Sequence, residues 1–268
     1  MSTNQALNRP IRVVMFGSGP KLNPDAKQFL CMLEEHPEID FLGAFCQAES
    51  QSLSAVFQDL WQRRGALAFL LFVVWILNRV SHFVLHPTEE IKLANRLKNI
   101  SGRIHFVKNI HAPIVLAHVS TLSPDLGLIY GSPILKPELF EKPSLGTLGI
   151  HHGKVPEYRG NKTAFWMMYN GEPCAGVTIQ KVNKGLDTGT IVKTGDVKAY
   201  RRTYPAVVRE LEALGLDLYI QSILEVKRGV AEFKPQTGLK GKLYRNPKPT
   251  DFLKFWAKQI KRRLKFDK

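Results

Sequence analysis

The sequence predicts an α/β protein with a mostly parallel sheet and helices on both faces. Four apolar runs of strand length alternate with helix-like stretches such as 26–35, and they lie at 11–16, 39–46, 104–107 and 126–130. This alternation is typical of a parallel sheet. The first run leads into Gly17-Ser-Gly19, a glycine turn of the kind that joins a strand to a helix.

The chain is long enough for one large domain with an appendage. After a further strand-like run at 191–198, an amphipathic stretch covers 204–227. We therefore expect a main domain over residues 1–230. The basic, proline-punctuated residues 231–268 are predicted to form a small C-terminal helical appendage.

A helical insert at about 55–100 interrupts the alternation of strands and helices. It contains Ala66–Leu77, an uninterrupted apolar run preceded by two arginines. The run is too short to cross a bilayer, which takes about 20 residues. It is either a buried helix or an interfacial helix that lies on a membrane or on a partner subunit.

The charge balance limits the classes of partner. Lys and Arg outnumber Asp and Glu by 38 to 23, and a net charge of +15 attracts anions. The sequence has no zinc-finger spacing, RNP-like aromatic pattern or heptad-linked basic region, so we expect no sequence-specific nucleic-acid binding. Three separated cysteines and a polar N-terminus favour a cytoplasmic protein without a metal site.

Two glycine-containing clusters carry the candidate chemistry. A short strand at 147–150 delivers His151 at its carboxyl end, where open α/β sheets bind their ligands. A second strand at 177–182 ends in the tight loop 185–189, which would hold the carboxylate of Asp187 close to backbone amides. A lone histidine after a strand often has only a structural role. Paired with a carboxylate in one cleft, it forms an acid–base unit.

The motifs Gly-Ile-His-His-Gly (149–153), Lys-Val-Pro-Glu-Tyr-Arg-Gly (154–160) and Gly-Leu-Asp-Thr-Gly (185–189) occur in that order. The pattern resembles the folate-dependent formyltransferases, whose signature runs Asn-x-His-Pro-Ser, Leu-Pro-x-Tyr-Arg-Gly and Gly-Leu-Asp-x-Gly. Upstream, 123–125 and 133–140 are similar to a strand and a pterin-side loop of that family. The resemblance covers roughly residues 10 to 230 and implies the Rossmann-like formyltransferase fold.

By this resemblance His151 and Asp187 take the positions of the family's catalytic histidine and aspartate. A protonated imidazole would stabilise the oxyanion formed when an amine attacks a formyl carbon, and a carboxylate would raise the pKa of that imidazole. The implied donor is 10-formyltetrahydrofolate, bound between two loops mainly through backbone groups. The residues implied for this slot are Pro133, Ile134, Leu135, Phe140, Val182, Asn183, Gly185 and Leu186.

One position departs from the family pattern. Gly149 replaces the asparagine of the signature, and His152 replaces its proline. Losing an oxyanion donor costs about 2.7–4 kcal/mol, or 100- to 1000-fold in rate. We therefore expect a substitute donor, with His152 ahead of Lys154 and Asn161. The triplet Asn109-Ile-His111 also spells the family motif, but the rest of the signature does not follow it, and we interpret it as a loop after the third strand.

The resemblance predicts formyl transfer to an amine. The acceptor that we expect is an amino sugar, which could be phosphorylated, nucleotide-linked or lipid-linked, because the sequence leaves too little room for the β-barrel domain of the initiator-tRNA enzymes. The alternatives are methionyl-tRNA formyltransferase-like or glycinamide ribonucleotide formyltransferase-like activity. A descendant that binds folate or a nucleotide sugar without turnover is a further alternative, which Gly149 favours.

The C-terminal residues 252–266 are predicted to form an amphipathic basic helix. Phe252, Trp256, Ile260 and Leu264 recur every four residues, and lysines and arginines fill the intervals. We expect this helix and Ala66–Leu77 to lie close together and to offer a basic, apolar face to a membrane surface or a partner. The alternative is that Ala66–Leu77 fills the core. A second copy of the chain is a further candidate partner, as a homodimer.

Overall fold

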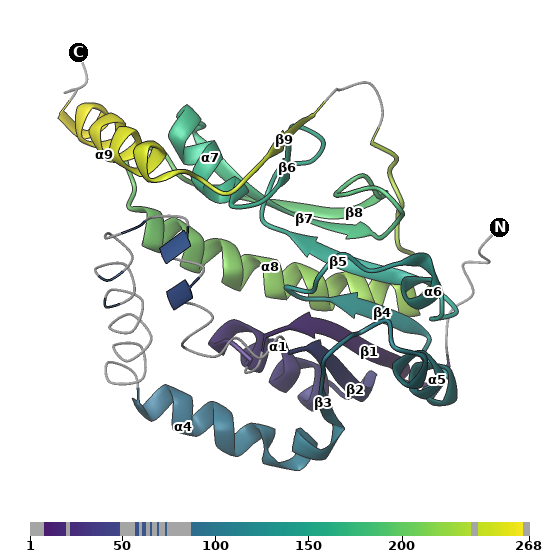
Figure 1. The fold of residues 1–268 in the computed structure, drawn as a ribbon. Helices are drawn as coiled ribbons and strands as arrows, with labels where there is room; N and C mark the ends of the chain where they lie inside the picture. Colours follow the sequence, from purple (N-terminus) through teal and green to yellow (C-terminus); the bar gives the residue numbers. More distant parts are fainter. Residues whose placement is uncertain are drawn as a thin grey trace.

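The structure is a computed structural model that describes residues 8–19, 22–48, 87–236 and 241–264, together with 57, 58, 61, 62, 65, 69 and 73. It contains a seven-stranded sheet in the order β3-β2-β1-β4-β5-β7-β8 and a two-stranded sheet of β6 and β9 (Figure 1). Strands β1 to β5 are parallel, whereas β7 and β8 are antiparallel to their neighbours. The predicted fold class is confirmed.

The strands are β1 Ile11–Ser18, β2 Ile39–Gln47, β3 Ile104–Val107, β4 Leu126–Ile129, β5 Thr147–His151, β6 Tyr158–Gly160, β7 Cys174–Lys181, β8 Ile191–Lys198 and β9 Lys242–Tyr244. The helices are α1 Pro24–Glu35, α4 Pro87–Arg96, the 3-10 helix η1 Leu97–Arg103, α5 Pro113–Leu122, α6 Pro137–Phe140, α7 Thr163–Asn170, α8 Tyr204–Lys227 and α9 Pro249–Leu264.

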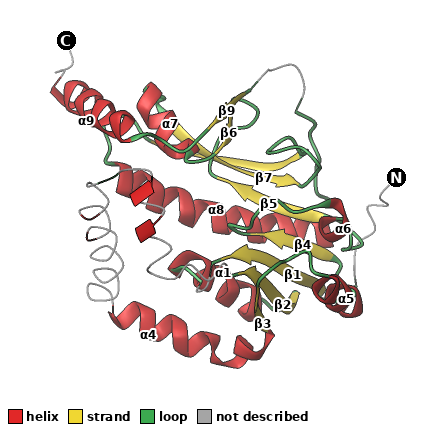
Figure 2. Ribbon diagram, in the orientation of Figure 1, coloured by secondary structure: helices red, strands yellow, loops and turns green. Residues whose placement is uncertain are grey.

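The central strand β1 is buried on both faces. Val13 and Met15 belong to the core under α1 and α8, whereas Val14 and Phe16 belong to the core under α5 and α6. Figure 2 shows these helices in separate layers on either side of the sheet. Burial on both faces explains why β1 reads as a continuous apolar run instead of an alternating one.

Helix α8 ties together the two strands that lead to the candidate site. The hydroxyl of Tyr219, which is fully buried, donates to Leu148 O in β5 at 2.7 Å and accepts from Ile129 N in β4 at 2.9 Å. A buried hydroxyl that satisfies backbone groups of two neighbouring strands fixes their relative position. The carboxyl ends of β4 and β5 are therefore held in place from one face of the sheet.

The C-terminal segment returns to the main sheet region. Strand β9 pairs with β6, and α9 packs on α7, where Phe255 is buried and its ring lies 4.9 Å from that of Phe165. In the insert, α4 contacts α1 through the ion pair between Arg96 and Glu35. The prediction for Ala66–Leu77 lies outside the described residues, apart from Phe69, which is exposed, and Val73, which is half-buried.

Candidate functional site

Two cavities meet at the carboxyl end of β5. The acceptor-side cavity has a volume of about 490 Å³ and reaches α7 and the start of α8. The loop-side cavity, of about 350 Å³, lies between residues 131–135 and the β7–β8 loop at 182–189. Both cavities are lined by Gly131, Ile150, His151, Gly160 and Asn161. A group bound in one cavity can therefore meet a group bound in the other beside His151.

His151 is held in one orientation by a backbone carbonyl. The side chain is buried, and Nε2 lies 2.7 Å from Tyr158 O. Because a carbonyl oxygen only accepts hydrogen bonds, Nε2 carries a proton and donates a hydrogen bond to Tyr158 O. In the neutral ring, Nδ1 then has a free lone pair, and this atom lies 3.6 Å from Oδ1 of Asp187. Both His151 and Asp187 line the loop-side cavity, which agrees with the expectation that they share one cleft.

The carboxylate of Asp187 is held in place by hydrogen bonds to both of its oxygens. Oδ2 accepts from Gly160 N at 2.8 Å, and Oδ1 accepts from Gln180 Nε2 at 3.2 Å. The backbone of Asp187 is in the left-handed region, with φ of 51°, where aspartate is tolerated better than most residues. The expected contact with a backbone amide is present, and it comes from the Tyr-Arg-Gly motif.

Asp187 reaches His151 by a route that differs from the expected one. The sequence interpretation places both residues at neighbouring strand ends, but β7 is antiparallel to β5, and Gln180 near its end pairs with Gly149. The carboxyl end of β7 therefore lies toward the start of β5. The loop at 182–190 instead brings Asp187 back to His151.

The pKa of His151 is shifted in the opposite direction from the one expected. Burial lowers the pKa of His151 below its ordinary value, and this effect outweighs the upward contributions of Asp187 and of the Tyr158 carbonyl. Nearby His152 lowers the pKa further. The imidazole is therefore neutral near pH 7 and is suited to accept a proton.

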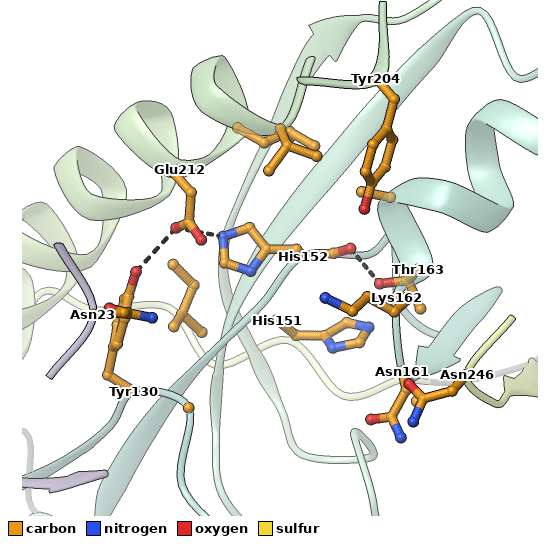
Figure 3. Close-up of a pocket in the computed structure, with 16 residues that line it drawn as sticks. Asn23, Tyr130, His151, His152, Asn161, Lys162, Thr163, Tyr204, Glu212 and Asn246 are labelled. Atoms are coloured by element: carbon orange, nitrogen blue, oxygen red, sulfur yellow. Dashed lines mark hydrogen bonds and ion pairs between the residues drawn. The ribbon is translucent and has the colours of Figure 1, made fainter. Parts of the chain in front are cut away.

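His152 points away from His151 toward α8 (Figure 3). Its Nε2 lies 2.9 Å from Oε2 of Glu212, which also accepts from the hydroxyl of Tyr130 at 3.1 Å. Burial raises the pKa of Glu212, but the contacts with His152 and Tyr130 lower it more, and the net shift is downward. The acceptor-side cavity thus contains a carboxylate that stays charged at neutral pH.

Seven of the eight residues implied for the pterin slot line the loop-side cavity: Pro133, Ile134, Leu135, Val182, Asn183, Gly185 and Leu186. Phe140 does not; its side chain packs in the core beneath α5 and α6 and is 3% exposed. Asn183 organises the loop, since its Oδ1 accepts from Gly185 N at 3.0 Å and from the hydroxyl of Thr188 at 2.9 Å.

The three candidates for the missing donor lie in different places. The Nε2 of His152 is engaged by Glu212, and Nζ of Lys154 lies 3.1 Å from Asp196 on β8. Asn161 lines both cavities and lies on the same side of the pocket as the ring of His151 (Figure 3). The geometry favours Asn161 over His152, the reverse of the order expected from the sequence.

Gly153 occupies the serine position of the family signature. A Cβ added at Gly153 would overlap both Nε2 of His151 and Tyr158 O, the two atoms that form the orienting hydrogen bond. Glycine is therefore needed at 153 for this orientation of His151. The triplet at 109–111 forms a loop between β3 and α5, as expected, and the His111 ring accepts from Lys136 N at 3.0 Å.

Sequence reasoning missed the polar residues that other segments bring to the site. Glu212 had a signal, because it interrupts the apolar stripe of Val208, Leu211 and Gly215 on α8. Gln236 and Asn246 had none. Gln236 Nε2 donates to Gly189 O at 2.8 Å and to Asp187 O at 3.1 Å, and Asn246 lines the acceptor-side cavity. Only the tertiary structure brings these residues to the site.

The fold and site define an α/β protein with a histidine–carboxylate pair between two cavities. Among the described residues, no group of three or more His, Cys, Asp or Glu side chains could hold a metal ion. Residues 106–221 match the family model described as "Formyl transferase". Over this segment the chain is similar to the formyltransferase family.

Individual proteins of known name show the same similarity. Over 123 residues the chain is 32% identical to a methionyl-tRNA formyltransferase of Thermodesulfovibrio yellowstonii, an alignment that covers 45% of this chain and 40% of that protein. A sugar N-formyltransferase from Shewanella sp FDAARGOS_354 has a similar fold, with a TM-score of 0.58 and 15% identity, and the match covers 91% of this chain and 86% of that protein. A phosphoribosylglycinamide formyltransferase from Bacillus halodurans also has a similar fold, with a TM-score of 0.55 and 14% identity, and the match covers 80% of this chain and 94% of that protein.

Proposed function

We propose that this protein transfers a formyl group from 10-formyltetrahydrofolate to an amine, with the reaction centred on His151. The observation that carries the proposal is the position of the His151–Asp187 pair where the two cavities meet. A donor in one cavity and an acceptor in the other would come together beside this pair. Such positioning is itself a large part of catalysis.

The loop-side cavity suits a flat, partly apolar group. Ile134 and Leu186 are exposed apolar side chains from the two loops that form its walls. The backbone of the β7–β8 loop adds polar groups that could pair with ring nitrogens. When bound there, the formyl donor would supply a carbonyl carbon that an amine can attack.

His151 and Asp187 divide the acid–base work. Nε2 of His151 is committed to the carbonyl of Tyr158, so Nδ1 is the atom that accepts the proton lost by the amine. The imidazolium formed in this step would be stabilised by the carboxylate of Asp187, 3.6 Å away, and it would return the proton to the departing nitrogen of the formyl donor when the bond from that nitrogen to the formyl carbon breaks. Gln180 and Gly160 keep that carboxylate in place through their hydrogen bonds.

We propose an amino sugar as the acceptor. The acceptor-side cavity is lined by hydroxyl, amide and carboxylate groups that suit a polyhydroxylated ligand: Asn23, Tyr130, Thr163, Tyr204, Glu212 and Asn246. Lys162 lines the same cavity and would attract a phosphate on the sugar. The similar fold of a sugar N-formyltransferase supports this choice, whereas the methionyl-tRNA relatives favour the alternative acceptor.

The test is incubation of the protein with 10-formyltetrahydrofolate and separate panels of amino sugars, nucleotide-linked amino sugars, glycinamide ribonucleotide and aminoacyl-tRNA. Folate absorbance and mass spectrometry of the acceptor report transfer. Asp187→Asn should abolish most of the activity, while the matched change Asp196→Asn, at an exposed carboxylate on β8, should leave it intact. Turnover that Asp187→Asn leaves unchanged would contradict the proposal.

A second candidate function is binding of the folate without turnover, and the glycine at 149 favours it. Calorimetric titration with 5-formyltetrahydrofolate, a stable analogue, separates the two. Binding to the wild-type protein together with no formyl product in any panel would support the binding function.

A further inference from the structure

The outward face of α9 combines large apolar side chains with cations. Leu253, Trp256 and Ile260 are 73%, 51% and 57% exposed, and Lys254 and Lys261 are exposed about two helical turns apart. Exposed apolar residues that occur singly are ordinary, but a group of this size on one helix marks an interaction surface. We call these five residues the α9 face.

The opposite side of α9 is already packed, so the orientation of the helix is set by the protein. Phe255 is 2% exposed, and Arg262 donates to Met168 O at 2.6 Å and to Tyr169 O at 3.0 Å. The ammonium of Lys258 lies 3.7 Å from the centre of the Tyr169 ring. These contacts with α7 hold the α9 face outward, and they leave its apolar side chains without cover from α7.

The charge of α9 indicates the kind of surface that it binds. The helix is basic: its one acidic residue is Asp251 in the first turn, and its lysines are Lys254, Lys258 and Lys261. The whole chain carries a net charge of +15. A helix with exposed tryptophan and aliphatic side chains next to lysines matches the interface of an anionic bilayer, where the apolar groups enter the acyl boundary and the lysines meet phosphates. In the part of the chain that the structure describes, no helix is long and apolar enough to cross a membrane.

We propose that the α9 face docks the protein on the surface of an anionic membrane. Docking would leave the acceptor-side cavity about one helix diameter from the membrane surface, because Tyr204, which lines that cavity, contacts Phe255 on the packed side of α9 with ring centroids 6.2 Å apart. Figure 1 shows α9 beside α7 and near the N-terminal end of α8, the helix that begins with Tyr204. The docking itself does not depend on the proposed formyl transfer.

The experiment is co-sedimentation of the full chain with vesicles of equal parts phosphatidylglycerol and phosphatidylcholine, compared with vesicles of phosphatidylcholine alone. We expect binding to the anionic vesicles that weakens at high salt. Lys254→Gln and Lys261→Gln should each weaken binding about fivefold, as expected for one lysine near an anionic surface. Leu253→Ser and Trp256→Ser should each weaken it about tenfold or more, from lost apolar burial.

Matched control variants change the same residue types elsewhere on the surface. Lys108→Gln, after β3, and Ile114→Ser, on α5, alter exposed side chains away from α9 and should leave vesicle binding unchanged. Unchanged melting temperatures would show that the α9 variants are folded. The proposal is overturned if the wild-type protein does not sediment with anionic vesicles, or if the control variants weaken binding as much as the α9 variants. A protein that forms dimers in solution, dissociates after Trp256→Ser and ignores vesicles would assign the face to a second copy instead.

Discussion

We expect the amide of Asn161 to substitute for the side chain missing at Gly149, and its removal is the most direct test of the site. Asn161 lines both cavities beside His151, whereas the other two candidates are engaged by Glu212 and Asp196. Asn161→Ala should therefore lower kcat for formyl transfer about 100- to 1000-fold, the effect of removing one oxyanion donor. His152→Ala should have a smaller effect on kcat and a larger one on the KM of the acceptor.

A rescue experiment distinguishes a lost donor from local damage. Gly149 lies in extended strand backbone, and a Cβ there would meet Val182 Cγ2 at 3.4 Å and Ile129 Cβ at 3.7 Å, which are ordinary contacts. Gly149→Asn should consequently fold with a stability change within about 1 kcal/mol. In the Asn161→Ala background it should restore most of the lost rate, because the asparagine returns to its position in the family signature.

The assay is steady-state kinetics of the two single variants and the double variant with a saturating formyl donor, and Gly149→Ala serves as the steric control. We expect Gly149→Ala to give no rescue, since it adds a Cβ without a donor. The reasoning is refuted if Asn161→Ala retains the wild-type kcat, or if Gly149→Asn and Gly149→Ala have equal effects in the Asn161→Ala background.

Three further predictions concern the groups that position His151. Asp187→Asn should lower kcat about 100-fold. It should also move the acidic limb of kcat/KM to lower pH, because Asp187 raises the pKa of His151 against the larger effect of burial. An unmoved acidic limb would show that Asp187 does not act on the protonation of His151. Gly153→Ala should reduce kcat about 100-fold, since its Cβ would displace the ring of His151 from Tyr158 O, and a normal rate in a folded variant would show that this orientation is unnecessary. Gln236→Leu should lower kcat about tenfold at nearly constant KM, because it removes the two hydrogen bonds from Nε2 to the Asp187 loop, whose net contribution together is about 1.4 kcal/mol. If Gln236→Glu and Gln236→Leu lose kcat equally and circular dichroism shows both unfolded at the assay temperature, Gln236 acts on stability alone.

The sheet was predictable because the physics of its strands is local. The apolar runs 11–16 and 126–130 begin where β1 and β4 do, since burial on a sheet selects apolar, β-branched residues in a short range of sequence. The same holds for α8, whose bounds match the amphipathic stretch at 204–227. Strand direction is less local, and the antiparallel turn from β5 to β7 was not expected from the sequence.

The chemistry of His151 could be predicted only in part for the same reason. Its proximity to Asp187 follows from the order of the motifs, but its protonation depends on burial, which is a property of the assembled fold. The sequence interpretation assigned the carboxylate the dominant effect on the pKa, and the structure gives that effect to desolvation. A motif therefore identifies the reacting groups more securely than it identifies their charge.

The identity of the acceptor is even less accessible from the family motif. The motif residues surround His151 and the loop-side cavity, and they belong to the matched segment 106–221. The acceptor-side cavity also includes Asn23, which precedes that segment, and Asn246, which follows it and is carried by the chain that leaves β9. Because binding specificity comes from the groups that touch the ligand, two proteins with the same motif can accept different amines if these outlying residues differ. Substitutions at Asn23 and Asn246 should therefore change the ranking of acceptors more than they change the reaction of the donor.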